Sequence, residues 1–210
     1  MDTGGHGGGC EHCVEQGEGL SLFEVIDTAA VVAFNEETEG SAAGVFVPYT
    51  ERFGSHPPLV SDADAQLIIH IPFTASVKLQ SLVVMGDGDS AFFPAHVKLF
   101  ANPRAVIDFS NADDLEPTQE LDLAADALGV MPHLVNPPKF SSLSSLTLYI
   151  TANGSGDDDE QTRIKYIGLG GEHSALVGSR EVVITAYESR PQPSDHKTKA
   201  DAFGGTSSIF

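Results

Sequence analysis

The chain has little cysteine, little positive charge and no tryptophan. Of its 210 residues only Cys10 and Cys13 are cysteines, both near the N-terminus, so disulfides are not expected to hold the body of the fold. Eleven Lys and Arg residues stand against 30 Asp and Glu residues, which gives a net charge of −19 at pH 7. That charge repels nucleic-acid phosphates and an anionic membrane surface, so we expect neither as a partner.

Long apolar runs are missing as well. The longest, such as residues 29–34, are far too short to cross a bilayer. The first ten residues, MDTGGHGGGC, lack the basic start and the apolar core of a secretory signal. Together with the scarcity of cysteine, these features favour the cytoplasm, with the nucleus as a second location.

Composition divides the chain into three parts. Residues 1–18 are rich in Gly, His and Glu without any periodicity, and we expect them to be a disordered leader. Residues 19–190 contain nearly all the apolar runs and form the expected domain. Residues 191–210 are polar and rich in Pro, Gly and Ser, which predicts a flexible tail.

The apolar patterns in the domain are those of β-strands. Leu146, Leu148 and Ile150 alternate with more polar neighbours, as on a half-buried strand. Similar runs occupy residues 66–71, 77–85, 97–100, 164–166 and 182–187. Helical signal is confined to two short stretches, residues 27–33 with Asp27 as the cap and residues 121–128. Many short strands with one or two helical turns predict an all-β, antiparallel sandwich or barrel.

The chain contains no G-x-S-x-G, H-E-x-x-H or P-loop motif. Gly168, Gly170 and Gly171 lack the third glycine of a dinucleotide fingerprint, and we interpret them as a turn that closes a strand. His70 and His96 have no catalytic partner nearby in the sequence, so each is expected to bond the backbone through one ring nitrogen. We therefore predict no catalytic and no cofactor-binding residues.

The leader holds the one constellation that could bind a metal. In HGGGCEHC, His6, Cys10, His12 and Cys13 offer imidazole and thiolate ligands that suit zinc or copper. The alternative is an exposed leader without metal, because glycine flanks would have to be ordered on binding. The acidic stretches 87–89 and 157–160 do not match a calcium loop and are interpreted as solvated turns.

Several motifs in one order resemble the PITH domain, over roughly residues 19–190. They are GVFVPYTER at 44–52, SDADAQLIIHIPFT at 61–74, VKL at 77–79, KLFAN at 98–102 and TRIKYIGLGGE at 162–172. The resemblance implies a jelly-roll-like β-sandwich without known catalytic activity. It also implies docking on the 26S proteasome regulatory particle, as for the two-domain thioredoxin-like member of the family. The likeness is greatest to stand-alone members, which lack a thioredoxin domain.

The favoured hypothesis is a non-enzymatic protein-interaction module, acting as a monomer on the proteasome regulatory particle. One alternative is a small-ligand or metal-binding β-sandwich, which the absence of Trp and the presence of only four Tyr weaken for sugars. Another is a regulator of gene expression, as proposed for animal relatives. An enzyme acting through Cys10 and Cys13 ranks last, because no reaction can be named for it.

Overall fold

The computed structural model describes residues 21–157 and 159–174, all within one compact unit of the chain, Met1–Ser179. In these residues every helical segment is a short 3-10 turn, and no helix is long and apolar enough to span a bilayer. The strands are β1 (Val32–Phe34), β2 (Leu59–Val60), β3 (Leu67–Gly86), β4 (Pro94–Ala101), β5 (Gln119–Asp122), β6 (His133–Leu134), β7 (Leu143–Asn153) and β8 (Arg163–His173). The 3-10 turns are η2 (Phe23–Val25), η3 (Thr28–Ala30), η4 (Ser41–Val45), η5 (Tyr49–Glu51), η6 (Ser90–Phe92) and η7 (Pro137–Phe140). The all-β fold predicted from the sequence is confirmed.

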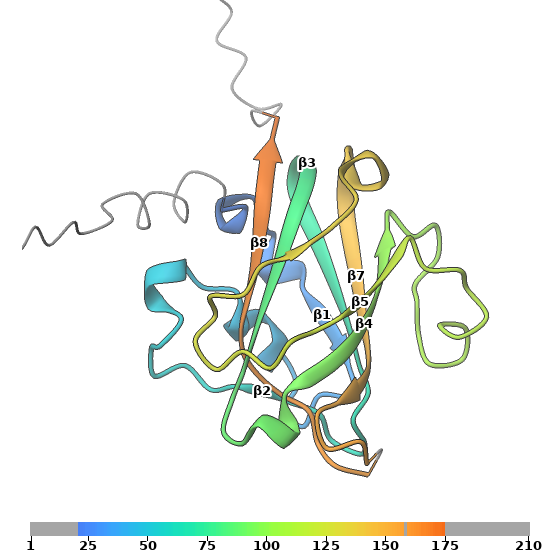
Figure 1. Cartoon of the computed structure of the whole chain (residues 1–210). Coiled ribbons are helices and arrows are strands. Elements are labelled where there is room, and N and C mark those ends of the chain that lie inside the picture. The colour runs from blue at the N-terminus through green and yellow to red at the C-terminus, as the bar shows by residue number, and fades with distance from the viewer. Residues whose placement is uncertain (1–20, 158, 175–210) are drawn as a thin grey trace, which may run out of the picture. The chain divides into compact units, whose positions relative to one another are not determined.

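β3 is one long strand that bends in the middle and belongs to two sheets. Its first half pairs with β7, from Leu67 opposite Ile150 to Pro72 opposite Ser145, and the register shifts after Pro72. Its second half pairs with β8. Because proline has no N–H to donate, the ladder is interrupted where the strand bends. Figure 1 shows the strand turning back on itself at one end of the sandwich.

The eight strands form one continuous hydrogen-bonded antiparallel sheet, which the bend in β3 divides into two sheets of the sandwich. The first half of β3 lies in the order β1–β3–β7–β4–β5, and the second half lies in the order β2–β8–β3–β6. The edges of the two sheets are joined on both sides. On one side Glu37 N donates to Val60 O (2.9 Å), and on the other Asn136 N donates to Gln119 Oε1 (2.8 Å). These bonds cover strand edges that could otherwise pair with another chain.

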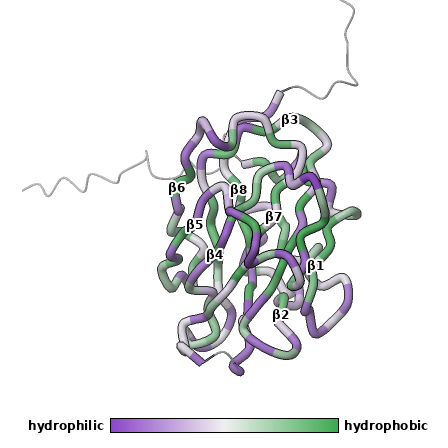
Figure 2. The backbone as a smooth tube through the Cα atoms, turned by 90° about the vertical axis from the view of Figure 1, so that its right-hand side faces the viewer, coloured by the Kyte–Doolittle hydropathy of each residue, from purple (hydrophilic) through white to green (hydrophobic). Residues whose placement is uncertain are grey.

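The core fills the space between the sheets. Alternate residues of the first half of β3, including Leu67 and Ile69, are fully buried and share one cluster with Leu79 of the second half and Leu146 and Leu148 of β7. Burying a side chain of this size contributes about 2 kcal/mol. Figure 2 shows long hydrophobic stretches along the strands, whereas many connecting loops are hydrophilic.

A smaller cluster lies on the outer face of the first sheet. Ile68, Phe100 and Tyr149 point away from the main core and are covered by Ile107 and Ala112 from the loop between β4 and β5. Because this loop packs its own apolar residues on the sheet, it is held against the sheet. The alternation of strand side chains thus buries apolar residues on both faces of β3, β4 and β7.

Two helix predictions were wrong in extent. In residues 27–33 only a 3-10 turn forms, and the side chain of Asp27 does not cap it; the next residues join β1, which pairs with β3. In residues 121–128 there is no helix, because the segment begins as the end of β5 and then wraps around the carboxylate of Asp126. The strand predicted at 182–187 lies outside the described residues.

The glycines predicted to close a strand lie inside β8. Gly171 faces Leu79 across the ladder, where the register between β3 and β8 shifts by one residue. A Cβ at Gly171 would collide with the carbonyl oxygen of Lys78, and it would lie 3.1 Å from the Cα of Leu79. Glycine is therefore required by close backbone approach, and the strand continues to His173.

Replacing Gly171 by alanine tests this close approach. We expect Gly171→Ala to lower the free energy of unfolding by about 3 kcal/mol, since the neighbouring backbone cannot move without breaking the ladder. Gly44→Ala is the matched control, because nothing lies within 4 Å of its added Cβ, and it should stay within about 1 kcal/mol of wild type. Urea unfolding of both variants gives the comparison. Equal stabilities would contradict the interpretation.

Candidate interaction surface

The metal site predicted in the leader cannot be placed. His6, Cys10, His12 and Cys13 lie outside the described residues, so that site stays a prediction. Within residues 21–157 and 159–174, no group of three or more His, Cys, Asp or Glu side chains could hold a metal ion. At the acidic turn after β3, the Asp89 carboxylate accepts the N–H of Ala91 (3.0 Å) and caps η6, which is a local structural role.

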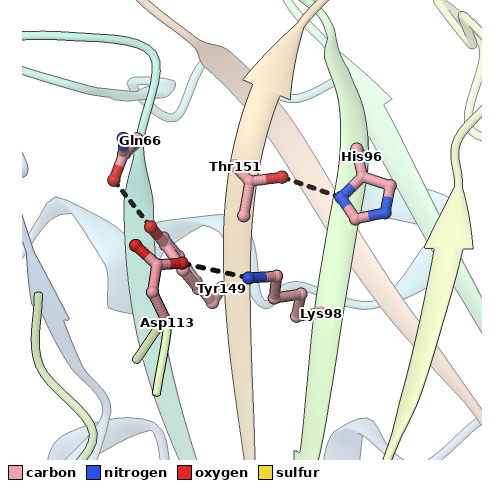
Figure 3. A network of polar contacts seen from close by, with 6 residues as sticks. All are labelled: Gln66, His96, Lys98, Asp113, Tyr149 and Thr151. Carbon is pink, nitrogen blue, oxygen red and sulfur yellow. Dashed lines mark hydrogen bonds and ion pairs between the residues drawn. The ribbon is translucent and has the colours of Figure 1, made fainter. Parts of the chain in front are cut away.

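The two strand histidines bond threonines, where we expected backbone partners. Nδ1 of His70 lies 3.0 Å from Oγ1 of Thr147, its direct neighbour across the ladder to β7. Nδ1 of His96 lies 2.7 Å from Oγ1 of Thr151 (Figure 3). Directly paired residues project from the same face of a sheet, which explains why His70 meets Thr147. His96 is paired with Ala152, and its ring reaches Thr151 where the register between β4 and β7 shifts. Burial lowers the pKa of His70, which favours its neutral form.

An open groove of about 410 Å³ lies beside the end of β8. Phe23, Pro48 and Tyr49 give it an apolar wall, and Glu24 and His173 add polar groups. Its shape and mixed lining fit contact with a partner surface better than enclosure of a small ligand.

Arg52 joins this groove to a second loop. Its guanidinium carbon lies 3.8 Å from the centre of the Tyr49 ring and 4.3 Å from that of Phe53. Nε donates to the carbonyl oxygen of Leu128 (2.9 Å), and Nη1 donates to that of Tyr49 (2.8 Å). Arg52 therefore fixes the loop at Tyr49 and Phe53 against residues 127–132, more than seventy positions away in the sequence.

The second loop is built around a buried carboxylate. Asp126, only 3% exposed, accepts four backbone N–H groups, with donor–acceptor distances of 2.7 to 2.9 Å. The donors are Leu128, Gly129, Val130 and Met131. Gly129 has a φ of +66°, a conformation that glycine adopts without strain. Hydrogen bonds to a charged acceptor are stronger than neutral ones, so the loop has one well-defined shape.

This shape exposes apolar side chains to solvent. We call the resulting patch the neutral apolar surface: Phe53 (56% exposed), Leu128 (57%), Val130 (52%) and Met131 (43%). No charged residue occurs in residues 127–132. Aromatic residues, Met and Arg are enriched in protein interfaces, and a clustered exposed apolar patch is typical of a docking site.

Sequence reasoning missed this surface. Residues 121–128 were interpreted as helix, although Asp126 followed by Ala-Leu-Gly-Val-Met was a signal for a side-chain-capped loop. The contact with Arg52 has no local signal, because it joins segments distant in the chain.

Comparison with known proteins identifies the family. The PITH domain family profile matches residues 12–191. The chain belongs to the PITH domain family. The PITH domain-containing protein CG6153 of Drosophila melanogaster is 39% identical over 201 residues, covering 92% of each chain. The human PITH domain-containing protein 1 is 35% identical over 199 residues, covering 91% of this chain and 90% of its own.

The resemblance predicted from the motifs is thus confirmed, while the three boundaries 1–18, 19–190 and 191–210 stay predictions. Among solved structures, the family 32 CBM of NanJ from C. perfringens, in complex with galactose, has a TM-score of 0.47. It is 11% identical, and the alignment covers 70% of this PITH chain and 97% of that module. A likeness at this level does not indicate what the PITH domain binds.

The Asp126 carboxylate can be tested by neutralising it. Asp126→Asn places an amide NH₂ where two backbone N–H groups need an acceptor, so we expect a loss of about 2–3 kcal/mol in unfolding free energy. Amide hydrogen exchange of residues 128–131 should accelerate at the same time. The control is Asp122→Asn on the exposed face of β5, expected to stay within about 0.5 kcal/mol of wild type. Unchanged protection of these amides in Asp126→Asn would refute the role of the carboxylate.

A second test uses Tyr166, whose ring lies edge-on to Tyr49 beneath Arg52. Burial raises the pKa of Tyr166 to about 12. Because folding raises this pKa above the ordinary tyrosine value of 10.0, the stabilisation is complete below about pH 10 and is lost as pH rises through about 12. Tyr166→Phe should therefore lose less unfolding free energy than wild type over this pH range. In a pH titration followed by tyrosinate absorbance at about 295 nm, the step at the highest pH should disappear. Parallel losses in both proteins would show that another group is responsible.

Proposed function

We propose that this PITH domain protein is a non-enzymatic interaction module that associates with the 26S proteasome regulatory particle as a monomer. Membership of the PITH family supports the choice of partner, through the proteasome docking that the resemblance implies. The observation that carries the interaction role is the neutral apolar surface, in which Phe53, Leu128, Val130 and Met131 are all exposed on rigid loops.

The rigidity of this surface favours binding. A loop that is already ordered loses little conformational entropy when a partner covers it, so more of the contact energy becomes affinity. The bonds from Arg52 and to Asp126 supply that order before any partner arrives. Arg52 stacks on exposed Phe53; arginine is among the residues that most often carry binding energy in interfaces, and aromatic residues are enriched there.

Charge supports a protein partner over nucleic acid. With a net charge of −19, electrostatic attraction favours a neutral or basic protein surface. Residues 127–132 of the neutral apolar surface carry no charge, so the part of binding that they contribute should depend little on salt.

Binding to purified proteasomes tests the proposal. The full chain should bind 26S particles and should not bind isolated 20S core particles, since the regulatory particle is the proposed partner. The double variant Leu128→Ser/Met131→Ser should weaken binding at least tenfold, about 1.4 kcal/mol or more, because two exposed apolar contacts are lost.

Val32→Ser serves as the control, because Val32 is 49% exposed on β1 and is not part of the neutral apolar surface. It should bind like wild type. If the full chain does not bind 26S particles at all, the proposed partner is wrong. If it binds but the double variant binds equally well, another surface makes the contact.

A further inference from the structure

The loop between β4 and β5, residues 102–118, presents a second apolar patch of different character. Val106 is 71% exposed, Leu115 43% and Phe109 42%. These three residues lie among the carboxylates Asp108, Asp113, Asp114 and Glu116, while Arg104 is the single basic residue in the loop. We call residues 104–116 of this loop the acidic apolar surface.

Contacts with the first sheet hold this surface in place. Ile107 (3% exposed) and Ala112 (fully buried) pack in the outer cluster, and Phe109 lies edge-on to Tyr149, with ring centres 6.1 Å apart. Lys98 donates from β4 to Asp113 Oδ1 (3.0 Å), as Figure 3 shows. Ile107 and Ala112 thus fix the loop against the sheet, Phe109 packs on Tyr149 with part of its ring exposed, and Val106 and Leu115 are exposed to solvent.

Bonds within the loop add to this order. The Asp108 carboxylate accepts from Ser110 N (2.9 Å) and from Ser110 Oγ (2.5 Å). Nδ2 of Asn111 donates to the carbonyl oxygen of Val106 (3.1 Å), and Oδ1 of Asn111 accepts the N–H of Asp108 (3.1 Å). The hydroxyl bond from Ser110 lowers the pKa of Asp108, which keeps this carboxylate charged. Val106 and Phe109 are therefore displayed in a fixed relation to a negative charge.

The charge of the surface extends onto the neighbouring strand. Glu120 and Asp122 project as exposed residues of β5, opposite Lys98 and His96 of β4. Lys98 is only 19% exposed and is already paired with Asp113, so Arg104 is the basic side chain that this surface exposes to solvent, against four carboxylates. The field at Val106, Phe109 and Leu115 is therefore negative, in contrast to the uncharged segment 127–132 of the neutral apolar surface.

We propose that the acidic apolar surface is a second docking site, for a segment of a partner protein that carries Lys or Arg beside an apolar anchor residue. The carboxylates would attract and orient the cationic side chains, and the apolar anchor would cover Val106, Phe109 and Leu115. Carboxylates repel nucleic acid and acidic proteins, so charge complementarity selects this class of partner. The site is separate from the neutral apolar surface and does not depend on the proteasome as partner.

The test is an NMR titration of the isotope-labelled full chain with a synthetic helical probe that carries leucine on one face and lysine on the other. Chemical shift changes should concentrate on residues 104–116. Raising salt from about 0.05 M to about 0.5 M should weaken binding roughly tenfold, because the attraction is screened. Two controls are a leucine–glutamate peptide, which should not bind, and a lysine peptide without leucine, which should bind at least tenfold more weakly.

Variants of the chain separate the apolar from the charged contribution. Val106→Ser/Leu115→Ser changes only exposed residues and should weaken binding of the leucine–lysine probe about tenfold. Asp114→Lys/Glu116→Lys should weaken binding of this probe by a similar factor. Leu128→Ser/Met131→Ser, in the neutral apolar surface, should leave probe binding unchanged. Thermal unfolding of each variant verifies that the fold is kept.

Four outcomes would overturn the proposal. Shift changes spread over the whole molecule, or equal binding of the lysine peptide, would indicate diffuse attraction to an acidic protein. Loss of binding in Leu128→Ser/Met131→Ser alone would place the site on the other surface. Concentration-dependent dimers in sedimentation that disappear in Val106→Ser/Leu115→Ser would identify a second copy of the chain as the occupant.

Discussion

β3 changes from one sheet to the other between Pro72 and Val77, and the two sheets are tied together by this bend. The first half sets the register of β1 and β7, and the second half sets that of β8 and β6. A slip of one residue in either half of β3 would turn its buried side chains to the other face of the sheet. The alternation of buried side chains along β3 therefore fixes the strand register in both sheets. The close approach of Gly171 to the Lys78 carbonyl is part of the same arrangement, because it lets β8 lie against the start of the second half.

The two exposed surfaces follow from a common principle, in which buried polar or apolar anchors hold a loop whose other residues face solvent. Around Asp126 the anchor is a carboxylate that satisfies four backbone N–H groups. In residues 102–118 the anchors are Ile107, Ala112 and the Lys98–Asp113 pair. Loops ordered in this way can display apolar residues without collapsing onto the core, at the cost of leaving them in water until a partner binds.

The surfaces differ in charge, and this difference separates the partners that they suit. A neutral patch gains its affinity from burial and packing and is only weakly affected by salt. A patch among carboxylates gains attraction and orientation from electrostatics and selects against acidic partners.

The sequence by itself determined the class of the fold and the family. Alternating β-branched and aromatic residues predicted the strands at 77–85, 97–100 and 146–151, because the period of two is a local property of a pleated strand. The ordered motifs from GVFVPYTER to TRIKYIGLGGE identified the PITH family, which the comparisons confirmed.

Only the tertiary structure decided where β3 bends into a second sheet, why the glycines of β8 lie inside a strand, and which apolar residues remain exposed. Neither surface had a complete signal in the chain. Arg52 contacts Leu128 across 76 positions of the sequence, and Lys98 of β4 contacts Asp113 because the loop after β4 folds back over the strand. The physical reason is that burial and close approach are set by contacts between distant segments, whereas sequence patterns report local geometry.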